Sequence, residues 1–587
     1  IAAEVGATAP PPQAITLADG RAAWRSTING KQPDTGKAVR AVVVSTSRDG
    51  AVTTMLAIGT PDGLDSQRDA VSQIADSLAL TAPQVYGIPH DQALFELGGE
   101  SNNPREYDPA TSDGNALIFS TLVAFSPQLA VEPDLASSWD VSADGTVYTF
   151  HLRPSARFHN GRPVVASDVV YSWERAADPA TNSNLVLTYL GDIVGLADRR
   201  AGKAQSIRGI AALDDHTLQV TIDAPKPYFL MKLTHGTAGV VDRSNVESSP
   251  EWYRTPNGSG PYRLARWDRA KLQLYERNDS YYLPPPAIRY IVVQLYSGLG
   301  LNLYETGAID MTGIGRADVA RMRDPDEPLH ADLREGVSMC TSKITFDVQQ
   351  PPFDDAKVRQ AFALAVDKAR YNEVVLHGEV VTAHGLYPPA LPGYNPTLHE
   401  LEYDPALARQ RLAESRYSSA DQLPPIVFTT SGYGSDVSAS VDAVVGMWQS
   451  TLGVKIQVEN LEPDHAQDEI QAGRHGQVLL GGWCADYPDP ENFADVLFHT
   501  GAEFNDGNYS NPTLDRLLEQ ARVERDPAKR LAMYQQAETL IVDDAPAVFL
   551  NHGLSFVLVK PRVKGYVLTP IHYSLERYLS LEPDANK

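Results

Sequence analysis

Residues 481–493 read Gly-Gly-Trp-Cys-Ala-Asp-Tyr-Pro-Asp-Pro-Glu-Asn-Phe, and they follow the apolar run 477–480, which is typical of a buried strand. The Pro-Asp-Pro within this stretch cannot continue a central strand, because proline donates no hydrogen bond to a sheet. We therefore expect a strand to end here and to bring Trp483, Cys484 and Asp486 to a sheet edge or to the wall of a cleft.

An aromatic ring beside a carboxylate suits a ligand that has an apolar body and an ammonium group. Trp483 offers the apolar face, and Asp486 offers the ionised carboxylate. The same pattern is also typical of a core tryptophan at a strand end and of a turn-forming aspartate, so both interpretations stay open at this point.

Length and composition limit the class of protein. The chain has 587 residues, too many for one hydrophobic core, so several domains or lobes are expected. Its formal net charge of −24 argues against a nucleic acid or an anionic membrane as partner, because phosphate groups bind to basic surfaces. No run of about 18 apolar residues is present, so no transmembrane helix is expected. No signal peptide is found at Ile1, and any export signal or anchor is expected outside this chain.

The first part of the chain differs in character from the rest. Residues 1–13 are small and proline-rich, which is typical of a disordered leader. Residues 14–82 predict a small α/β unit that resembles the closing half of a PsbP-like domain, and residues 83–91 predict a linker. Within the unit we expect strands at 23–28, 38–45 and 51–58, a hairpin turn at 47–50 and one helix at 65–78.

From about residue 92 the chain carries a series of ordered motifs. Asp144-Gly145 predicts a hairpin turn, and Ser167-Asp168 predicts the cap of a helix through residues 170–173. The other motifs are Tyr107-Asp108-Pro109, residues 132–139 (Glu-Pro-Asp-Leu-Ala-Ser-Ser-Trp), Asn160-Gly161, Ser259-Gly260-Pro261-Tyr262, residues 304–310 (Tyr-Glu-Thr-Gly-Ala-Ile-Asp) and residues 351–355 (Pro-Pro-Phe-Asp-Asp). In this order they resemble the signature of the family-5 extracellular solute-binding proteins, the peptide- and nickel-binding receptors of ABC importers.

The last of these motifs also has a structural interpretation that needs no ligand. Asp354 or Asp355 is a good N-cap, and the apolar residues between 358 and 366 lie on one face of a helix. We expect this helix to pack against a core.

The two cysteines, Cys340 and Cys484, lie 144 residues apart. By themselves they predict either two unrelated buried thiols or a disulfide, and neither has a histidine at zinc-ligand spacing. The match to the family is most specific here, because Cys340-Thr341 and residues 483–487 (Trp-Cys-Ala-Asp-Tyr) are similar to motifs of the oligopeptide-binding branch.

That resemblance implies a site. The two cysteines would form a disulfide, and Asp486 would pair with the α-amino group of a bound peptide. The backbone of Gly482, Trp483 and Cys484 would hydrogen-bond the peptide as if it were an added strand. The disulfide in turn implies an oxidising, extracytoplasmic compartment.

Two departures from the oligopeptide-binding pattern leave the peptide length open. In place of a Glu-Gly-Val stretch on the opposite lobe the chain has Asp113, Gly114 and Asn115, which we take as candidate ligand-binding residues. A basic residue before the Gly-Trp pair is also absent, so the upstream Arg474 and His475 are the candidates for binding a peptide's C-terminus.

Other chemistry finds little support. The sequence has no His-Glu-Xaa-Xaa-His, Walker A or Gly-Xaa-Ser-Xaa-Gly motif, so we expect no enzyme, no cofactor and no metal site. Asp486, Asp489 and Glu491 resemble a carboxylate set for glycoside hydrolysis or Ca²⁺ binding, but the two prolines among them favour a turn.

We therefore predict a two-lobed α/β protein of the periplasmic-binding-protein type, with two hinge crossings between the lobes. Lobe I would use residues 92–336 and 555–587, and lobe II residues 337–554. The predicted function is that of an extracytoplasmic receptor, expected to be monomeric, that passes short peptides to the permease of an ABC importer. The alternatives are a receptor for an oligosaccharide or a nickel chelate, a sensor or chaperone module, and a hydrolase that uses Asp486.

Overall fold

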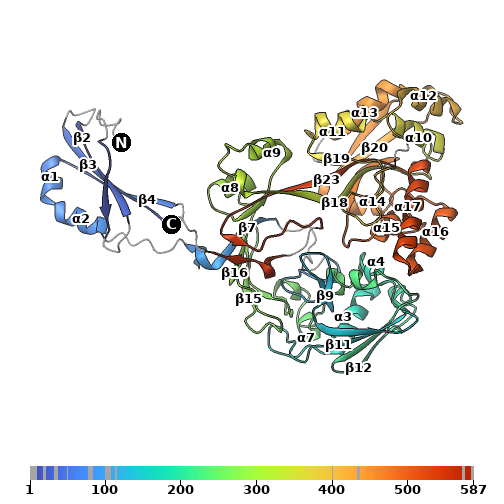
Figure 1. Cartoon of the computed structure of the whole chain (residues 1–587), viewed down its shortest axis with the longest axis horizontal. Coiled ribbons are helices and arrows are strands. Elements are labelled where there is room, and N and C mark those ends of the chain that lie inside the picture. The colour runs from blue at the N-terminus through green and yellow to red at the C-terminus, as the bar shows by residue number, and fades with distance from the viewer. Residues whose placement is uncertain are drawn as a thin grey trace.

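A computed structural model describes residues 10–17, 22–31, 37–48, 51–76, 84–99, 107–112, 115–398, 401–432, 437–571 and 575–582 of the chain. Figure 1 shows a small N-terminal unit, drawn in blue, that stands apart from two larger lobes. Most of the predicted leader lies outside the described residues.

The N-terminal unit is an antiparallel sheet with two short helices along one side. Its strands pair in the order β1-β2-β3-β4. The two strands of the expected hairpin pair up to Arg48 opposite Ala51, although residues 49 and 50 of its turn lie outside the described residues. The single helix predicted at 65–78 is wrong, because two shorter helices replace it. Thr60 starts the first of them early by accepting a hydrogen bond from the backbone of Gly63. The elements are β1 (Gln13–Thr16), β2 (Ala22–Lys31), β3 (Ala38–Arg48), β4 (Ala51–Gly59), α1 (Pro61–Ser66) and α2 (Arg68–Asp76).

Lobe I contains two four-stranded sheets. One has the order β14-β15-β16-β7, in which β7 runs parallel to β16, and the other has the order β10-β11-β13-β12. Their strands are β7 (Ala93–Gly98), β10 (Ala136–Val141), β11 (Val147–Leu152), β12 (Ile210–Asp214), β13 (Thr217–Thr221), β14 (Tyr262–Asp268), β15 (Leu272–Arg277) and β16 (Tyr290–Leu295). The helices are α3 (Ala166–Ala176), α4 (Val186–Leu190), α5 (Leu196–Arg200), α6 (Phe229–Lys232), α7 (Arg243–Val246), α8 (Gly300–Glu305) and α9 (Arg316–Arg323).

A buried ion pair joins distant parts of lobe I. Asp310, the last residue of the Tyr-Glu-Thr-Gly-Ala-Ile-Asp motif, accepts two hydrogen bonds of 2.6 Å from Arg562 and one of 2.8 Å from the backbone of Phe95. This motif therefore holds the C-terminal segment against the start of β7.

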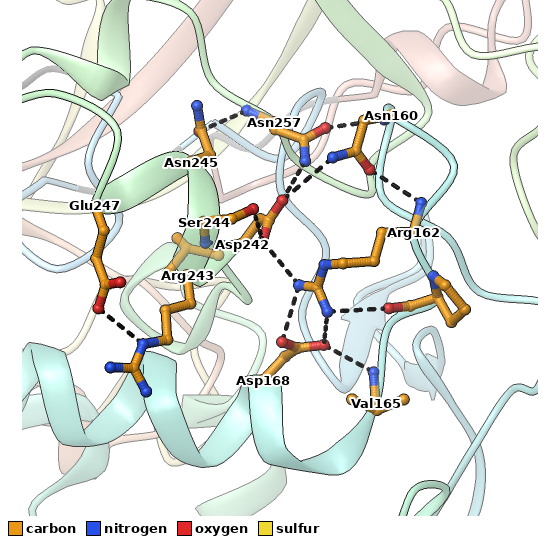
Figure 2. Close-up of polar contacts among 12 residues, drawn as sticks. Asn160, Arg162, Val165, Asp168, Asp242, Arg243, Ser244, Asn245, Glu247 and Asn257 are labelled. Atoms are coloured by element: carbon orange, nitrogen blue, oxygen red, sulfur yellow. Dashed lines mark hydrogen bonds and ion pairs between the residues drawn. The ribbon is translucent and has the colours of Figure 1, made fainter.

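A second polar network, drawn in Figure 2, fixes the start of α3. Arg162 lies between the carboxylates of Asp168 and Asp242, with donor–acceptor distances of 2.9 Å to each. Asp168 also accepts a hydrogen bond from the backbone of Val165, which is the N-cap. The predicted cap at Ser167-Asp168 is therefore wrong by two residues, because Asp168 caps from inside the first turn.

Lobe II is built on one mixed sheet covered by helices. Within it β18 (Leu333–Phe346) pairs with β22 (Val478–Cys484), and β20 (Ile426–Ser431) lies between β22 and β21 (Ile456–Leu461). The predicted core-facing helix is confirmed as α10 (Ala356–Leu364), with Asp355 as its N-cap. The other helices are α11 (Lys368–Val375), α12 (Pro405–Glu414), α13 (Ala439–Leu452), α14 (Pro463–Gln471), α15 (Glu491–Phe498), α16 (Pro512–Val523) and α17 (Pro527–Asp544).

Two long strands belong to both lobes. β18 and β23 (Ala547–Val559) pair antiparallel along most of their length, with a register shift between Val337 and Thr341. At one end of β18, Leu333 packs against a hydrophobic cluster of lobe I, and at the other end Ile344 lies in the core of lobe II. The chain therefore passes between the lobes along a pair of strands, and the predicted two-lobed α/β fold is confirmed.

Candidate functional site

The last part of β22 has a free edge. Along one side the whole strand pairs with β18, from Val478 opposite Phe346 to Cys484 opposite Cys340. Along the other side β20 pairs only with the first two residues, Val478 and Leu479. Among the residues that the structure describes, none pairs with that second edge from Leu480 onward.

The free edge is accessible and held in place. Gly481, Gly482 and Cys484 are exposed, and Gly481 has open space where a side chain would begin. The expected disulfide between Cys340 and Cys484 is present, and it fixes the end of β22 to β18 near the crossing between the lobes. An exposed, rigid strand edge can accept hydrogen bonds from an added strand.

Asp486 lies just beyond this edge and faces lobe I. Together with Asn115 it lines a cavity of ≈ 410 Å³ between the two lobes. Its carboxylate accepts hydrogen bonds from the hydroxyl of Tyr189 at 2.7 Å and from the amide of Asn492 at 3.1 Å. No Lys, Arg or His nitrogen of the described residues lies within 4 Å of this carboxylate.

Lobe I supplies the other wall of the cavity. Tyr189 stacks on His235 with ring centroids 3.5 Å apart, and His235 lines the cavity. Arg577 and the buried Asp134 lie on the same wall. Burial raises the pKa of Asp134, although Arg577 opposes the shift. The cavity therefore presents charges of both signs around a partly apolar space.

The lobes also contact each other through an ion pair beside the cavity. Lys232 of α6 lies 3.1 Å from Glu491 of α15 and 3.3 Å from Asp192, and all three side chains are largely buried. Burial raises the pKa of Glu491 to about 6, and Lys232 opposes this shift. The structure thus shows the lobes in a closed arrangement.

The structure separates some of the residues that the sequence groups together. Trp483 does not line the cavity, because its ring packs on Phe504 at 5.0 Å and its indole N–H donates to Asn492. Arg474 is exposed and pairs locally with Glu469 at 2.6 Å. Asp113 and Gly114 lie outside the described residues, whereas Asn115 does line the cavity.

Several residues at the site had no signal in the sequence. Tyr189 is 297 residues from Asp486, and Lys232 and Arg577 stand in stretches without a motif.

Within the described parts of the chain, no group of three or more His, Cys, Asp or Glu side chains could hold a metal ion. No described helix is both long and apolar enough to cross a membrane.

Two lobes joined by paired strands, with an accessible strand edge and a charged cavity between them, define a ligand-binding protein of the periplasmic-binding-protein type. The family model of the bacterial extracellular solute-binding proteins, family 5, matches residues 130–505. The periplasmic oligopeptide-binding protein OppA of Escherichia coli is 31% identical over 519 residues, which cover 84% of this chain and 93% of OppA. This chain therefore belongs to family 5 of the bacterial extracellular solute-binding proteins, a family of binding proteins.

Solved structures agree with this assignment. The OppA of Burkholderia pseudomallei superimposes with a TM-score of 0.74 at 26% identity, over 84% of this chain and 100% of that one. The OppA of Listeria monocytogenes, solved with a bound peptide, gives a TM-score of 0.70 at 26% identity, again over 84% and 100% of the two chains.

Proposed function

We propose that this protein captures short peptides between its lobes and delivers them to an ABC importer. The observation that carries the proposal is the free edge of β22, which ends beside the carboxylate of Asp486, a group that forms no ion pair with the described residues. The relatives named above are oligopeptide-binding proteins, and one of them was solved with peptide, which supports the same ligand class here.

The backbone of β22 and the carboxylate of Asp486 would have different roles in recognising a peptide. Main-chain hydrogen bonds from Gly482, Trp483 and Cys484 would fix an extended peptide without reading its side chains, so many sequences could bind. Asp486 would set the direction by accepting hydrogen bonds from the peptide's α-ammonium group. A hydrogen bond to a charged group contributes about 1.5–3 kcal/mol, enough to orient the peptide.

Ligand binding would be coupled to closure. We propose that β18 and β23 form the hinge near residues 336–340 and 551–555, where the register of their pairing shifts. Lobe I then comprises residues 92–336 and 555–587, lobe II residues 337–554, and residues 14–82 a separate unit joined by the linker 83–91. A ligand that contacts both lobes would favour the closed state over open ones.

The cellular setting follows from the family. We propose an extracytoplasmic location, a monomeric state, and the permease of an ABC importer as partner. The protein would have no catalytic role, because the carboxylates near the site are engaged in structural contacts: Asp489 pairs with Arg530 at 2.7 Å, and Glu491 pairs with Lys232.

The test is calorimetry with tetrapeptides on the parent protein and on Asp486→Asn. Peptide affinity should fall tenfold or more in the variant, since each 1.4 kcal/mol is about tenfold. Acetylating the peptide's N-terminus should cost the parent a similar factor, and the two losses should not add, because both remove one interaction. Asp421→Asn is the matched control, since Asp421 is an exposed carboxylate of lobe II away from the cavity. Full additivity, or an Asp486→Asn protein that binds free-amine peptides as tightly as the parent, would contradict the role of Asp486.

A further inference from the structure

One buried lysine lies next to the free edge of β22. Lys343 of β18 stands directly opposite Gly481 of β22 in the strand register, and only 5% of its surface is exposed. Its ammonium donates to the hydroxyl of Thr345 at 2.6 Å. No carboxylate of the described residues lies within 4 Å of it, and burial lowers its pKa although Asp506 opposes the shift.

Two of the other three buried lysines among the described residues make ion pairs. Lys226 and Lys232, which are also buried, both pair with Asp192, at 2.5 Å and 3.3 Å. An ammonium that is removed from water has a large desolvation cost unless an anion or several acceptors compensate it. Among the described residues Lys343 donates to one neutral hydroxyl, and the carboxylate of Asp506 acts on it electrostatically without forming an ion pair within 4 Å.

The strand geometry would let Lys343 contact a ligand. Neighbouring strands are about 4.8 Å apart, so a strand added to the free edge of β22 would lie roughly 10 Å from β18. The residue between them is Gly481, which has no side chain and borders open space. The four-carbon stem of the lysine can therefore pass over Gly481 and carry the ammonium toward the added strand.

The position along β22 sets the length of peptide involved. Gly481 is five residues before Asp486, which corresponds to roughly 16 Å of extended chain. A peptide whose amino group lies at Asp486 would thus have its fourth or fifth residue level with Lys343. A carboxylate at that point would form a direct ion pair with the ammonium, which makes none with the described residues.

We infer that Lys343 is a specificity-determining residue that binds a carboxylate of the captured peptide, about four or five residues from its amino end. The inference rests on the proposed peptide-binding function and deepens it. The carboxylate can be the C-terminus of a tetra- or pentapeptide, or an acidic side chain at that position in a longer one. Both sources share the same chemistry, and the experiment separates them.

The experiment compares the parent with Lys343→Met and with the matched control Lys368→Met. Lys368 is also a buried lysine of lobe II, but its ammonium donates to the carbonyl of Ala383 at 2.7 Å. Three mixtures of peptides with free amino ends are offered at equal concentration, and the retained peptides are quantified by mass spectrometry. They are randomised tetrapeptides with a free C-terminus, the same peptides amidated, and amidated hexapeptides with glutamate or glutamine at the fourth and fifth positions.

For a C-terminal carboxylate, the parent and Lys368→Met should retain the free-acid tetrapeptides at least tenfold better than the amides, and Lys343→Met should lose this preference. If the carboxylate is that of a side chain, the parent and Lys368→Met should retain the glutamate hexapeptides better than the glutamine hexapeptides, and Lys343→Met should lose this preference. If the parent retains all mixtures equally, the inference is overturned and the proposed function stays intact. This outcome depends on the parent protein alone, so it can be read even where a variant fails to fold. A parent that retains none overturns the proposed function, and the inference with it.

Discussion

The ammonium of Lys232 in lobe I lies 3.1 Å from the carboxylate of Glu491 in lobe II, and at most 6% of either side chain is exposed. Each group is therefore removed from water only while the lobes are closed. Because a buried charge needs a partner, losing Lys232 alone would disfavour the closed arrangement.

Replacing Lys232 should open the protein. In Lys232→Met, closure would bury Glu491 without a cation, at a cost of about 3–5 kcal/mol. We expect small-angle scattering to give a larger radius of gyration for the ligand-free variant than for the parent. Lys203→Met, which removes an exposed lysine from the same lobe, should leave the radius unchanged. Glu491→Gln combined with Lys232→Met should recover part of the closure, and equal radii in the parent and Lys232→Met would contradict this role.

The stability of the folded protein should also depend on pH. Burial raises the pKa of Glu491 from 4.5 to about 6, against the effect of Lys232, while Asp495 and Asp192 add to the rise. The folded protein therefore binds a proton at Glu491 more tightly than the unfolded chain does, so the contribution of this group to the free energy of unfolding is greatest below pH 4.5 and falls as the pH rises through about 6. The full change is about 2 kcal/mol.

Urea unfolding of the ligand-free protein between pH 4.5 and 7.5 would measure this trend in the free energy of unfolding. Other carboxyl groups titrate in the same range, so the decisive quantity is the difference between the parent and Glu491→Gln. The variant should show a weaker pH dependence. Identical pH profiles for the two proteins would exclude Glu491 as the source.

The disulfide should stabilise lobe II. Cys340 and Cys484 close a loop of 144 residues, for which the chain-entropy model gives about 5 kcal/mol. Urea unfolding of the parent with and without a reductant should show a lower midpoint after reduction, and a variant with both cysteines replaced by alanine should not respond to the reductant. Alkylation of both thiols in unfolded, non-reduced protein would contradict the bond itself.

The N-terminal unit should be dispensable for binding. Its small core is formed by its own residues, such as Leu17, Val42 and Val44, and the cavity is lined by residues from 115 onward. A chain that begins at residue 83 should therefore bind tetrapeptides with the affinity of the whole protein. A tenfold loss in calorimetry would instead give this unit a part in the site.

The sequence predicts those features that depend on local pattern or on a resemblance. The α10 helix begins where Asp355 caps it, and the pairing of Cys340 with Cys484 follows from two motifs of the oligopeptide-binding branch. The start of α3 is missed because Asp168 can cap either from the N-cap position or from within the first turn, and the choice depends on Arg162.

Only some of the residues of the site can be predicted from the sequence. Asp486 can be found because it follows a strand and a recognisable motif. Its partner Tyr189 cannot, because a single tyrosine in a short helix has no pattern that connects it to a residue in another lobe. The same is true of Lys343, whose importance depends on a glycine in the neighbouring strand. Contacts between lobes arise from tertiary packing, which local sequence does not encode.

The free edge of β22 has a further consequence for solubility. An unpaired strand edge is a template on which other chains can assemble, and many proteins cover or charge such edges to avoid aggregation. Here the edge leads into Ala485 and Asp486, which line a cavity that lobe I closes from the other side. This cavity of ≈ 410 Å³ is far too small to enclose a second folded molecule. Closure of the lobes over a bound peptide would therefore also hinder assembly of the protein with its own copies through this edge.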